Sequence, residues 1–344
     1  MCNIAGYTGF RRAAPILIEM MRREEGFWGG YYTGIATIHE GKLYSAKVLG
    51  DLDTLIRETD ALELPGNVGI IHARTPSGGG MEWSYPFVSC DQKLGFVENG
   101  SLGHFKDATD FVSAAVELEE KGHHMTSSTT DYVDGYPRLP GGTSVHYSDV
   151  QCHLIEENMK SGLDPLDALM KTLRDYPCED VGVAIHTEHP GKLFVSRYNQ
   201  PMNLARAAGE SFIATAPTAF PEGDYFGIQS LPANSGAVIT PDCVLLKTVM
   251  NPAVKVADMN PGVVLKAYDL ILQILREAKE PVPFSDFHFA CETVFPEGEL
   301  AQASPLGYAI LDSMLRSGVV EVVTVTLPGM AEGLTAPAFR MQLK

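Results

Sequence analysis

The sequence predicts an α/β protein of the α+β type, in which two β-sheets pack together and helices cover them. Strand-like apolar runs occur near both ends of the first 250 residues, helical periodicity lies between them, and a proline-punctuated stretch follows at 251–261. The strand-like runs are 3–8, 34–39, 42–49, 67–72, 93–98, 181–186, 192–196, 211–215 and 237–240. With 344 residues the chain is about twice the size of a typical domain, so two domains are expected.

The first part of the chain carries clear signals for individual elements. Apolar residues at helical spacing follow Pro15, which suits the first turn of a helix. The pair Glu40-Gly41 separates two strand-like runs and predicts a hairpin, and Asn99-Gly100 also predicts a turn. Further helices are expected at 52–60, 107–121, 150–159 and 165–173, and the polar stretch 125–148 is expected to form a long loop.

Residues 251–344 form a second predicted unit. Its expected elements are helices at 263–278, 283–294 and 305–316 and strands at 319–326 and 338–343, which together resemble a winged-helix module. We therefore expect domains at 1–250 and 251–344. The second unit has more Asp and Glu than Lys and Arg, whereas a DNA-reading module is normally basic, so it is expected to contact protein.

The composition argues against several function classes. The chain has 26 Lys and Arg against 43 Asp and Glu, and its formal charge of −17 repels nucleic acid and anionic membranes. It has no apolar run long enough to span a bilayer and no signal-peptide pattern. Six scattered cysteines form no C-x-x-C pair, and His72, His104 and His153 are expected to be structural, so no metal is implied. A soluble, cytoplasmic protein is expected.

The first two residues suggest a nucleophile. If Met1 is removed, Cys2 carries a thiol and a free α-amino group on the same residue. Such an amine titrates at about pH 7.7–8, so it can accept the thiol proton, which an amide nitrogen cannot do. A lone cysteine is more often a small buried apolar residue, but processing makes position 2 unusual. Cys2 is therefore the candidate catalytic residue.

Three motifs in this order resemble the class II glutamine amidotransferases. Cys2 begins C-N-I-A-G, Arg74 lies in H-A-R-T-P-S-G-G, and Asn99-Gly100 end V-E-N-G. The similarity is greatest to the glutaminase domain of glucosamine-fructose-6-phosphate aminotransferase, where these stretches read C-G-I-V-G, H-T-R-W-A-T-H-G and V-H-N-G. It extends weakly to about Asp242. The resemblance implies an N-terminal-nucleophile hydrolase with a four-layer α/β/β/α sandwich.

The resemblance also implies roles for individual residues. Cys2 would attack the side-chain amide of glutamine, and the Asn99 side chain and the Gly100 backbone N–H would stabilise the oxyanion. Arg74 would bind the α-carboxylate of the substrate with its planar guanidinium. Ser77 matches a threonine in the same loop of the family.

Two carboxylates are candidates for the group that binds the substrate's ammonium. Asp131 falls one position from the family's acidic residue when counted from Gly122, whereas Asp149 immediately precedes the helix expected at 150–159. Asp131 is slightly preferred. The loop also departs from the family, because the family's tryptophan is Thr75 here and its loop histidine is Gly78.

These residues predict a glutaminase-type amidotransferase that needs no cofactor and passes ammonia to a separate synthase subunit, and a homo-oligomer is compatible with the sequence. Two alternatives remain. The first is another N-terminal-nucleophile amidohydrolase acting on a different acyl amide, and Arg74 argues against it because an apolar acyl chain needs no cation. The second is a non-catalytic glutamine-binding sensor or assembly protein on the same fold, which the changes at Thr75 and Gly78 motivate.

Overall fold

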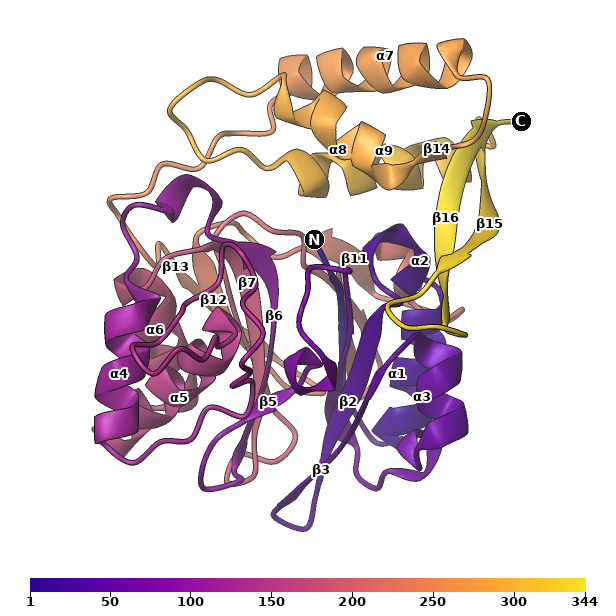
Figure 1. The fold of residues 1–344 in the computed structure, drawn as a ribbon. Coiled ribbons are helices and arrows are strands. Elements are labelled where there is room, and N and C mark those ends of the chain that lie inside the picture. Colours follow the sequence, from indigo (N-terminus) through magenta and orange to yellow (C-terminus); the bar gives the residue numbers. More distant parts are fainter.

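The computed structural model describes residues 1–344, and it has the layered α/β fold that the sequence predicts (Figure 1). Two antiparallel sheets pack face to face, and helices cover the outer face of each sheet. The seven-stranded sheet has the order β11-β9-β10-β1-β4-β2-β3, and the six-stranded sheet has the order β13-β12-β8-β7-β6-β5. The four layers are therefore helix, sheet, sheet and helix.

Most strands lie where the periodicity predicts them. The seven-stranded sheet contains β1 (Asn3–Thr8), β2 (Tyr32–His39), β3 (Lys42–Leu49), β4 (Val68–Arg74), β9 (Asn203–Ala207), β10 (Glu210–Ala214) and β11 (Gly227–Ser230). The six-stranded sheet contains β5 (Phe87–Val88), β6 (Leu94–Ser101), β7 (Glu179–His186), β8 (Leu193–Arg197), β12 (Ser235–Ile239) and β13 (Val244–Thr248). The predicted hairpin joins β2 to β3, and Gly41 in its turn has a φ of 72°.

The helices of the first 250 residues cover the two sheets. They are α1 (Ala13–Arg22), α2 (Glu25–Trp28), α3 (Leu52–Glu58), α4 (Phe111–Glu120), α5 (Tyr147–Lys160) and α6 (Pro165–Asp175). Helices α1 and α3 pack on the seven-stranded sheet, while α5 and α6 pack on the six-stranded sheet and α4 lies against α5. Asp164 caps α6 by accepting a hydrogen bond from the Asp167 backbone N–H.

The strand alternation separates two cores. On β4, Ile70 contributes to the core between the two sheets, and its neighbour Ile71 contributes to the core under α1 and α3. Consecutive residues of a strand face opposite sides of the sheet, so a strand buried on both faces reads as a continuous apolar run. This is why 67–72 could be recognised as a strand although it does not alternate with polar residues.

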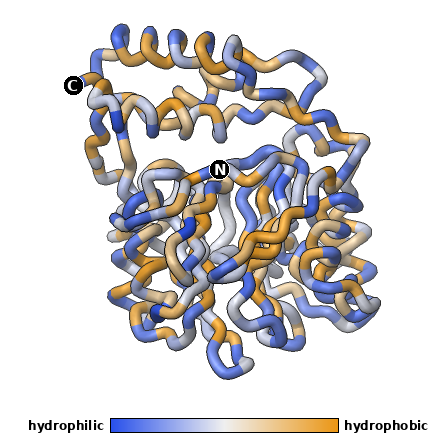
Figure 2. Tube along the Cα trace, turned by 180° about the vertical axis from the view of Figure 1, so that it is seen from behind, coloured by the Kyte–Doolittle hydropathy of each residue, from blue (hydrophilic) through white to orange (hydrophobic).

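The residues after 250 form three helices above the sandwich and a small sheet that runs down beside α2 (Figure 1). Their elements are α7 (Pro261–Glu277), β14 (Val282–Pro283), α8 (Phe284–Glu292), α9 (Ala303–Arg316), β15 (Val320–Pro328) and β16 (Thr335–Leu343). The sheet has the order β14-β16-β15. Figure 2 shows hydrophobic and hydrophilic bands alternating along α7, as expected for a helix with one buried side. The winged-helix likeness and the boundary near residue 250 stay predictions.

Phe27 on α2 joins the sandwich to the second unit. Its ring lies 5.6 Å from Phe284, 5.5 Å from Tyr308 and 5.0 Å from Phe339, measured between ring centroids. All three contacts have edge-to-face geometry, which aromatic pairs favour. The core of the second unit therefore includes a side chain from the first.

No helix in residues 1–344 combines the length and the apolar composition that a membrane span requires.

Replacing Phe27 tests this junction. We expect Phe27→Ala to lower the free energy of unfolding by about 3–5 kcal/mol, because removing a buried phenylalanine leaves a cavity among aromatic rings. Urea unfolding followed by circular dichroism measures the change. Phe10→Ala is the matched control, since the Phe10 side chain is 70% exposed. Equal midpoints for the two variants would contradict the role given to Phe27.

Candidate active site

Cys2 lies directly before β1, at a point where the two sheets meet. Strand β1 is in the middle of the seven-stranded sheet, between β10 and β4. The Cys2 backbone N–H donates a 2.7 Å hydrogen bond to the Asn99 Oδ1 atom on β6, which belongs to the other sheet. The structure thus brings two residues that are 97 positions apart in the sequence into direct contact.

Asn99 and Gly100 lie within a strand, so the turn predicted at this pair is wrong. β6 continues to Ser101 and stays paired with β7, with Gly100 opposite Asp180. A Cβ atom on Gly100 would lie 2.4 Å from the Glu179 carbonyl oxygen. Glycine is therefore required here because another backbone passes close to it, and the pairing with β7 overrides the local turn preference.

The Asn99 side chain has a free donor. Its Oδ1 atom accepts the hydrogen bond from Cys2, whereas its Nδ2 group is buried and has no partner in the structure. Buried donors are almost always hydrogen-bonded in proteins. An amide donor left free beside a thiol is suited to bind an oxygen atom of a bound molecule.

A cavity of about 380 Å³ opens beside Cys2. This volume suits one small molecule. The candidates Arg74, Ser77 and Gly100 line it together with Cys2. The remaining lining residues are Met1, Thr75, Tyr85, Glu98, Ser101, Leu102, Gly103, Lys106, Gly135, Tyr136, His146 and Tyr147. Four of the residues singled out in the sequence therefore border one cavity.

Arg74 is a buried cation without a carboxylate partner. Its side chain donates to the Gly78 carbonyl at 2.8 Å and to the Tyr136 hydroxyl at 3.3 Å. The guanidinium carbon also lies 4.6 Å from the centre of the Tyr32 ring. Arg74 is only 1% exposed, and a buried charge without a counter-charge costs several kcal/mol. These neutral contacts orient the guanidinium and leave its charge available for an anion.

The glycine-rich loop after β4 is held in place by side chains. Gly78 and Gly79 have φ values of 94° and 77°, which favour glycine. The Tyr32 hydroxyl lies within hydrogen-bond distance of both carbonyl oxygens, 3.1 Å and 2.8 Å away. In the same loop, Thr75 Oγ1 lies 3.9 Å from the Cys2 Sγ atom and donates to the Ser77 hydroxyl at 3.3 Å. The loop thus holds two hydroxyl groups near the thiol.

Glu98 is the one carboxylate among the residues that line the cavity. It accepts hydrogen bonds from the Ser148 hydroxyl and, at 3.3 Å, from the Tyr85 hydroxyl, while its Oε1 atom has no partner. Burial raises the pKa of the Glu98 carboxyl to about 7, against the lowering effect of these two hydroxyls and of the Arg74 charge. Burial thus favours the neutral form of the Glu98 carboxyl more than solvent exposure would.

The two aspartates proposed from the sequence do not line the cavity. Asp131 is exposed, and its backbone N–H donates to Thr129. Asp149 is buried in the first turn of α5, where its Oδ2 atom accepts a 2.8 Å hydrogen bond from the Ser127 backbone N–H. Glu98 is not among the site residues predicted from the sequence, although it stands where the family has histidine in V-H-N-G.

Met1 links the cavity to the second unit. It lines the cavity beside Cys2, and its Sδ atom accepts a 3.3 Å hydrogen bond from the Ser304 hydroxyl at the start of α9. The chain start therefore lies between the sandwich and the helices after residue 250 (Figure 1).

The fold and this arrangement together define a class. The Cys2 thiol and the unpaired Arg74 cation border one cavity. Asn99 does not line the cavity, but its free amide donor is held next to Cys2 by the hydrogen bond from the Cys2 backbone. A nucleophile, an oxyanion donor and a cation are the groups that an amidotransferase with an N-terminal nucleophile requires. This is the class that the three sequence motifs resemble, and the similar curated proteins support the resemblance to class II glutamine amidotransferases.

Similar curated proteins include glutamine–fructose-6-phosphate aminotransferases. The protein from Pyrococcus horikoshii is 28% identical over 273 residues, which cover 76% of this chain and 40% of the relative. The protein from Zymomonas mobilis is 29% identical over 218 residues, which cover 62% of this chain and 32% of the relative. This chain therefore spans less than half the length of these relatives. No protein-family model matches it.

The solved structures support the fold. Glutamine phosphoribosylpyrophosphate amidotransferase from B. subtilis superposes with a TM-score of 0.58 at 16% identity, covering 91% of this chain and 64% of that protein. A structure described as the allosteric regulatory enzyme of purine biosynthesis gives the same TM-score and identity. At this level of identity the likeness concerns the fold alone.

Proposed function

We propose that this chain is an enzyme that hydrolyses the side-chain amide of L-glutamine and supplies the ammonia to a synthase. One observation carries the proposal: the Cys2 thiol and the buried, unpaired Arg74 guanidinium border the same cavity. A thiol nucleophile acts on an acyl group, and a buried unpaired cation binds an anion. Glutamine offers an amide and a carboxylate in one small molecule.

In the proposed reaction, removal of Met1 gives Cys2 a free amine that accepts the thiol proton. The Sγ atom attacks the amide carbon, and the Asn99 Nδ2 group and the Gly100 N–H stabilise the negative charge on the oxygen. The C–N bond then breaks, and the nitrogen leaves as ammonia after taking the proton from the Cys2 ammonium. Water, deprotonated by the same amine, hydrolyses the thioester and releases glutamate.

Three side chains would recognise the amino-acid part of the substrate. Arg74 binds the α-carboxylate, and Ser77 donates a further hydrogen bond from the loop. We propose that Glu98 binds the α-ammonium in place of Asp131 or Asp149, because Glu98 lines the cavity and has an unpartnered oxygen. The exchange of histidine for glutamate in V-E-N-G is consistent with this role.

The acceptor of the ammonia is proposed to be a separate synthase subunit, and the protein is proposed to act in the cytoplasm. Residues 251–344 contain three helices and a small sheet, which suits a contact surface for another protein. All six cysteines are free in the structure, which fits a reducing compartment. We also propose that the chain associates with itself as a homo-oligomer.

Cys2→Ala tests the nucleophile. We expect Met1 to be absent by intact mass, and we expect Cys2→Ala to lower glutamate release by roughly 10³–10⁶-fold. A glutamine analogue with an electrophilic diazoketone in place of the amide should attach covalently to the wild type, one molecule per chain, and should not attach to Cys2→Ala. Cys243→Ala, which removes an exposed cysteine, is the control. Labelling of Cys2→Ala would contradict the mechanism, and so would a wild type that has lost Met1 and is not labelled. Both results can be read even if turnover of glutamine requires a partner.

Arg74→Lys tests the substrate class. The KM for glutamine should rise about tenfold to a hundredfold with little change in kcat, because a charge-assisted hydrogen bond contributes roughly 1.5–3 kcal/mol. Steady-state kinetics with glutamine and with 4-aminobutanamide, which lacks the α-carboxylate, measure the effect. The exposed Arg12→Lys serves as the control. A variant that weakens both substrates equally would favour an amidohydrolase for a different acyl amide.

Glu98→Gln tests the ammonium site through its pH dependence. As pH rises from about 6 to 8, Glu98 loses its proton, so glutamine should bind roughly tenfold more tightly, and Glu98→Gln should abolish this change. Calorimetry in the Cys2→Ala background measures binding without turnover. Asp131→Asn is measured in parallel. If that variant, rather than Glu98→Gln, weakens binding, the assignment made from the sequence is right and the one made from the cavity is wrong.

A further inference from the structure

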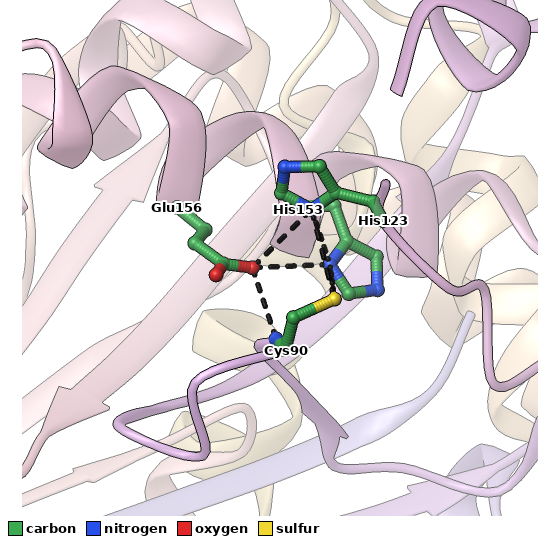
Figure 3. Close-up of side chains that lie close together, drawn as sticks. All are labelled: Cys90, His123, His153 and Glu156. Atoms are coloured by element: carbon green, nitrogen blue, oxygen red, sulfur yellow. Dashed lines mark hydrogen bonds and ion pairs between the residues drawn. The ribbon is translucent and has the colours of Figure 1, made fainter. Parts of the chain in front are cut away.

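A second cluster of reactive side chains lies outside the proposed active site. Cys90 from the turn between β5 and β6, His123 from the segment after α4, and His153 and Glu156 from α5 each point one ligand atom toward a common centre (Figure 3). These four atoms all lie within 4.8 Å of one another. The two histidines and the glutamate are each at least 96% buried, while Cys90 reaches the surface.

Hydrogen bonds alone do not account for this convergence. His153 Nδ1 lies 3.7 Å from the Cys90 Sγ atom, 3.2 Å from His123 Nδ1 and 3.3 Å from Glu156 Oε2. An imidazole nitrogen carries at most one hydrogen, so it can donate to only one of these three neighbours. His123 Nδ1 has the same neighbours, with Cys90 Sγ at 3.8 Å and Glu156 Oε2 at 3.4 Å. A cation at the centre would satisfy all four atoms at once.

Five of the six separations between these ligand atoms match a tetrahedral zinc site, and the sixth, between Cys90 Sγ and the Glu156 oxygen, lies within 4.8 Å. In zinc sites the Zn–N bond is about 2.0–2.1 Å, the Zn–O bond about 2.0–2.2 Å and the Zn–S bond about 2.3 Å. With tetrahedral angles, two nitrogen ligands then lie about 3.3 Å apart. Nitrogen and sulfur lie about 3.6 Å apart, and nitrogen and oxygen about 3.4 Å apart. The five distances given above differ from these values by no more than about 0.2 Å. We propose that Cys90, His123, His153 and Glu156 bind one structural zinc ion.

The ligands are supported by a second layer of partners. His123 Nε2 lies 2.9 Å from Glu157 Oε1, and His153 Nε2 lies 3.5 Å from Asp149 Oδ1. A carboxylate on the far nitrogen fixes the tautomer that leaves Nδ1 free for the metal. The Cys90 Sγ atom accepts a 3.5 Å hydrogen bond from the His124 backbone N–H. Glu157, which is hydrogen-bonded to His123, therefore orients a metal ligand in this proposal.

The ligand types select the metal and its role. A thiolate with two imidazoles favours zinc over magnesium or calcium, which prefer oxygen ligands. Four protein ligands leave no open position in a tetrahedral site, and such closed sites are structural. The ion would join the β5–β6 turn and the segment after α4 to α5. That segment leads to Tyr136 and His146, which line the cavity beside Cys2.

Metal titration of the purified full chain tests the site. After removal of bound metal with a chelator, one equivalent of Co²⁺ should bind and give the visible absorption of tetrahedral cobalt with a thiolate ligand, and one equivalent of Zn²⁺ should abolish it. Zinc should also raise Tm by several degrees. No tetrahedral spectrum and no shift in Tm would overturn the proposal. The titration uses the wild type and does not depend on turnover of glutamine.

Variants assign the ligands. Cys90→Ser should weaken zinc binding more than about a hundredfold, since loss of an outer partner alone costs roughly 10–100-fold. Glu157→Gln tests the outer layer and should weaken binding by that smaller factor. Cys243→Ser is the matched control, because Cys243 is another exposed cysteine outside the cluster. Unchanged cobalt spectra and zinc affinity in Cys90→Ser would overturn the assignment. If Cys90→Ser fails to fold, an unchanged zinc affinity in Glu157→Gln would overturn it instead.

Discussion

The packing of the two sheets at Cys2 and Asn99 is the contact on which the rest of the site depends. The hydrogen bond from Cys2 to Asn99 joins the central strand of one sheet to a strand of the other. It fixes the thiol beside the free amide of Asn99 without the use of a mobile loop. Sites on regular strands hold their geometry more tightly than sites on loops, which suits a reaction that needs a donor at a set distance from the nucleophile.

The fold could be predicted where local pattern and tertiary environment agree. The hairpin of β2 and β3 and the buried strand β4 follow from a turn pair and from apolar runs. The turn predicted at Asn99-Gly100 failed because both residues stay paired with β7, and this pairing overrides the local turn preference. Strands β11 and β13 escaped recognition because they are largely exposed and have no buried alternation.

Some residues of the candidate site could also be predicted from the sequence, and others could not. Cys2, Arg74 and Gly100 could be found because each stands in a short motif whose order along the chain matches a known class. Glu98 could not be assigned, because its role rests on the burial of one carboxylate in a shared cavity. The zinc ligands also lay beyond sequence reasoning, since only His153 and Glu156 are near each other in the chain and the fold brings Cys90 and His123 to them.

The second unit is placed to influence the first through the chain start. Phe27 belongs to its aromatic core, and Ser304 contacts Met1, which borders the cavity beside Cys2. Removal of Met1 would therefore free the Cys2 amine and also remove a contact between the site and α9. The second unit therefore holds the chain start in place only until Met1 is removed.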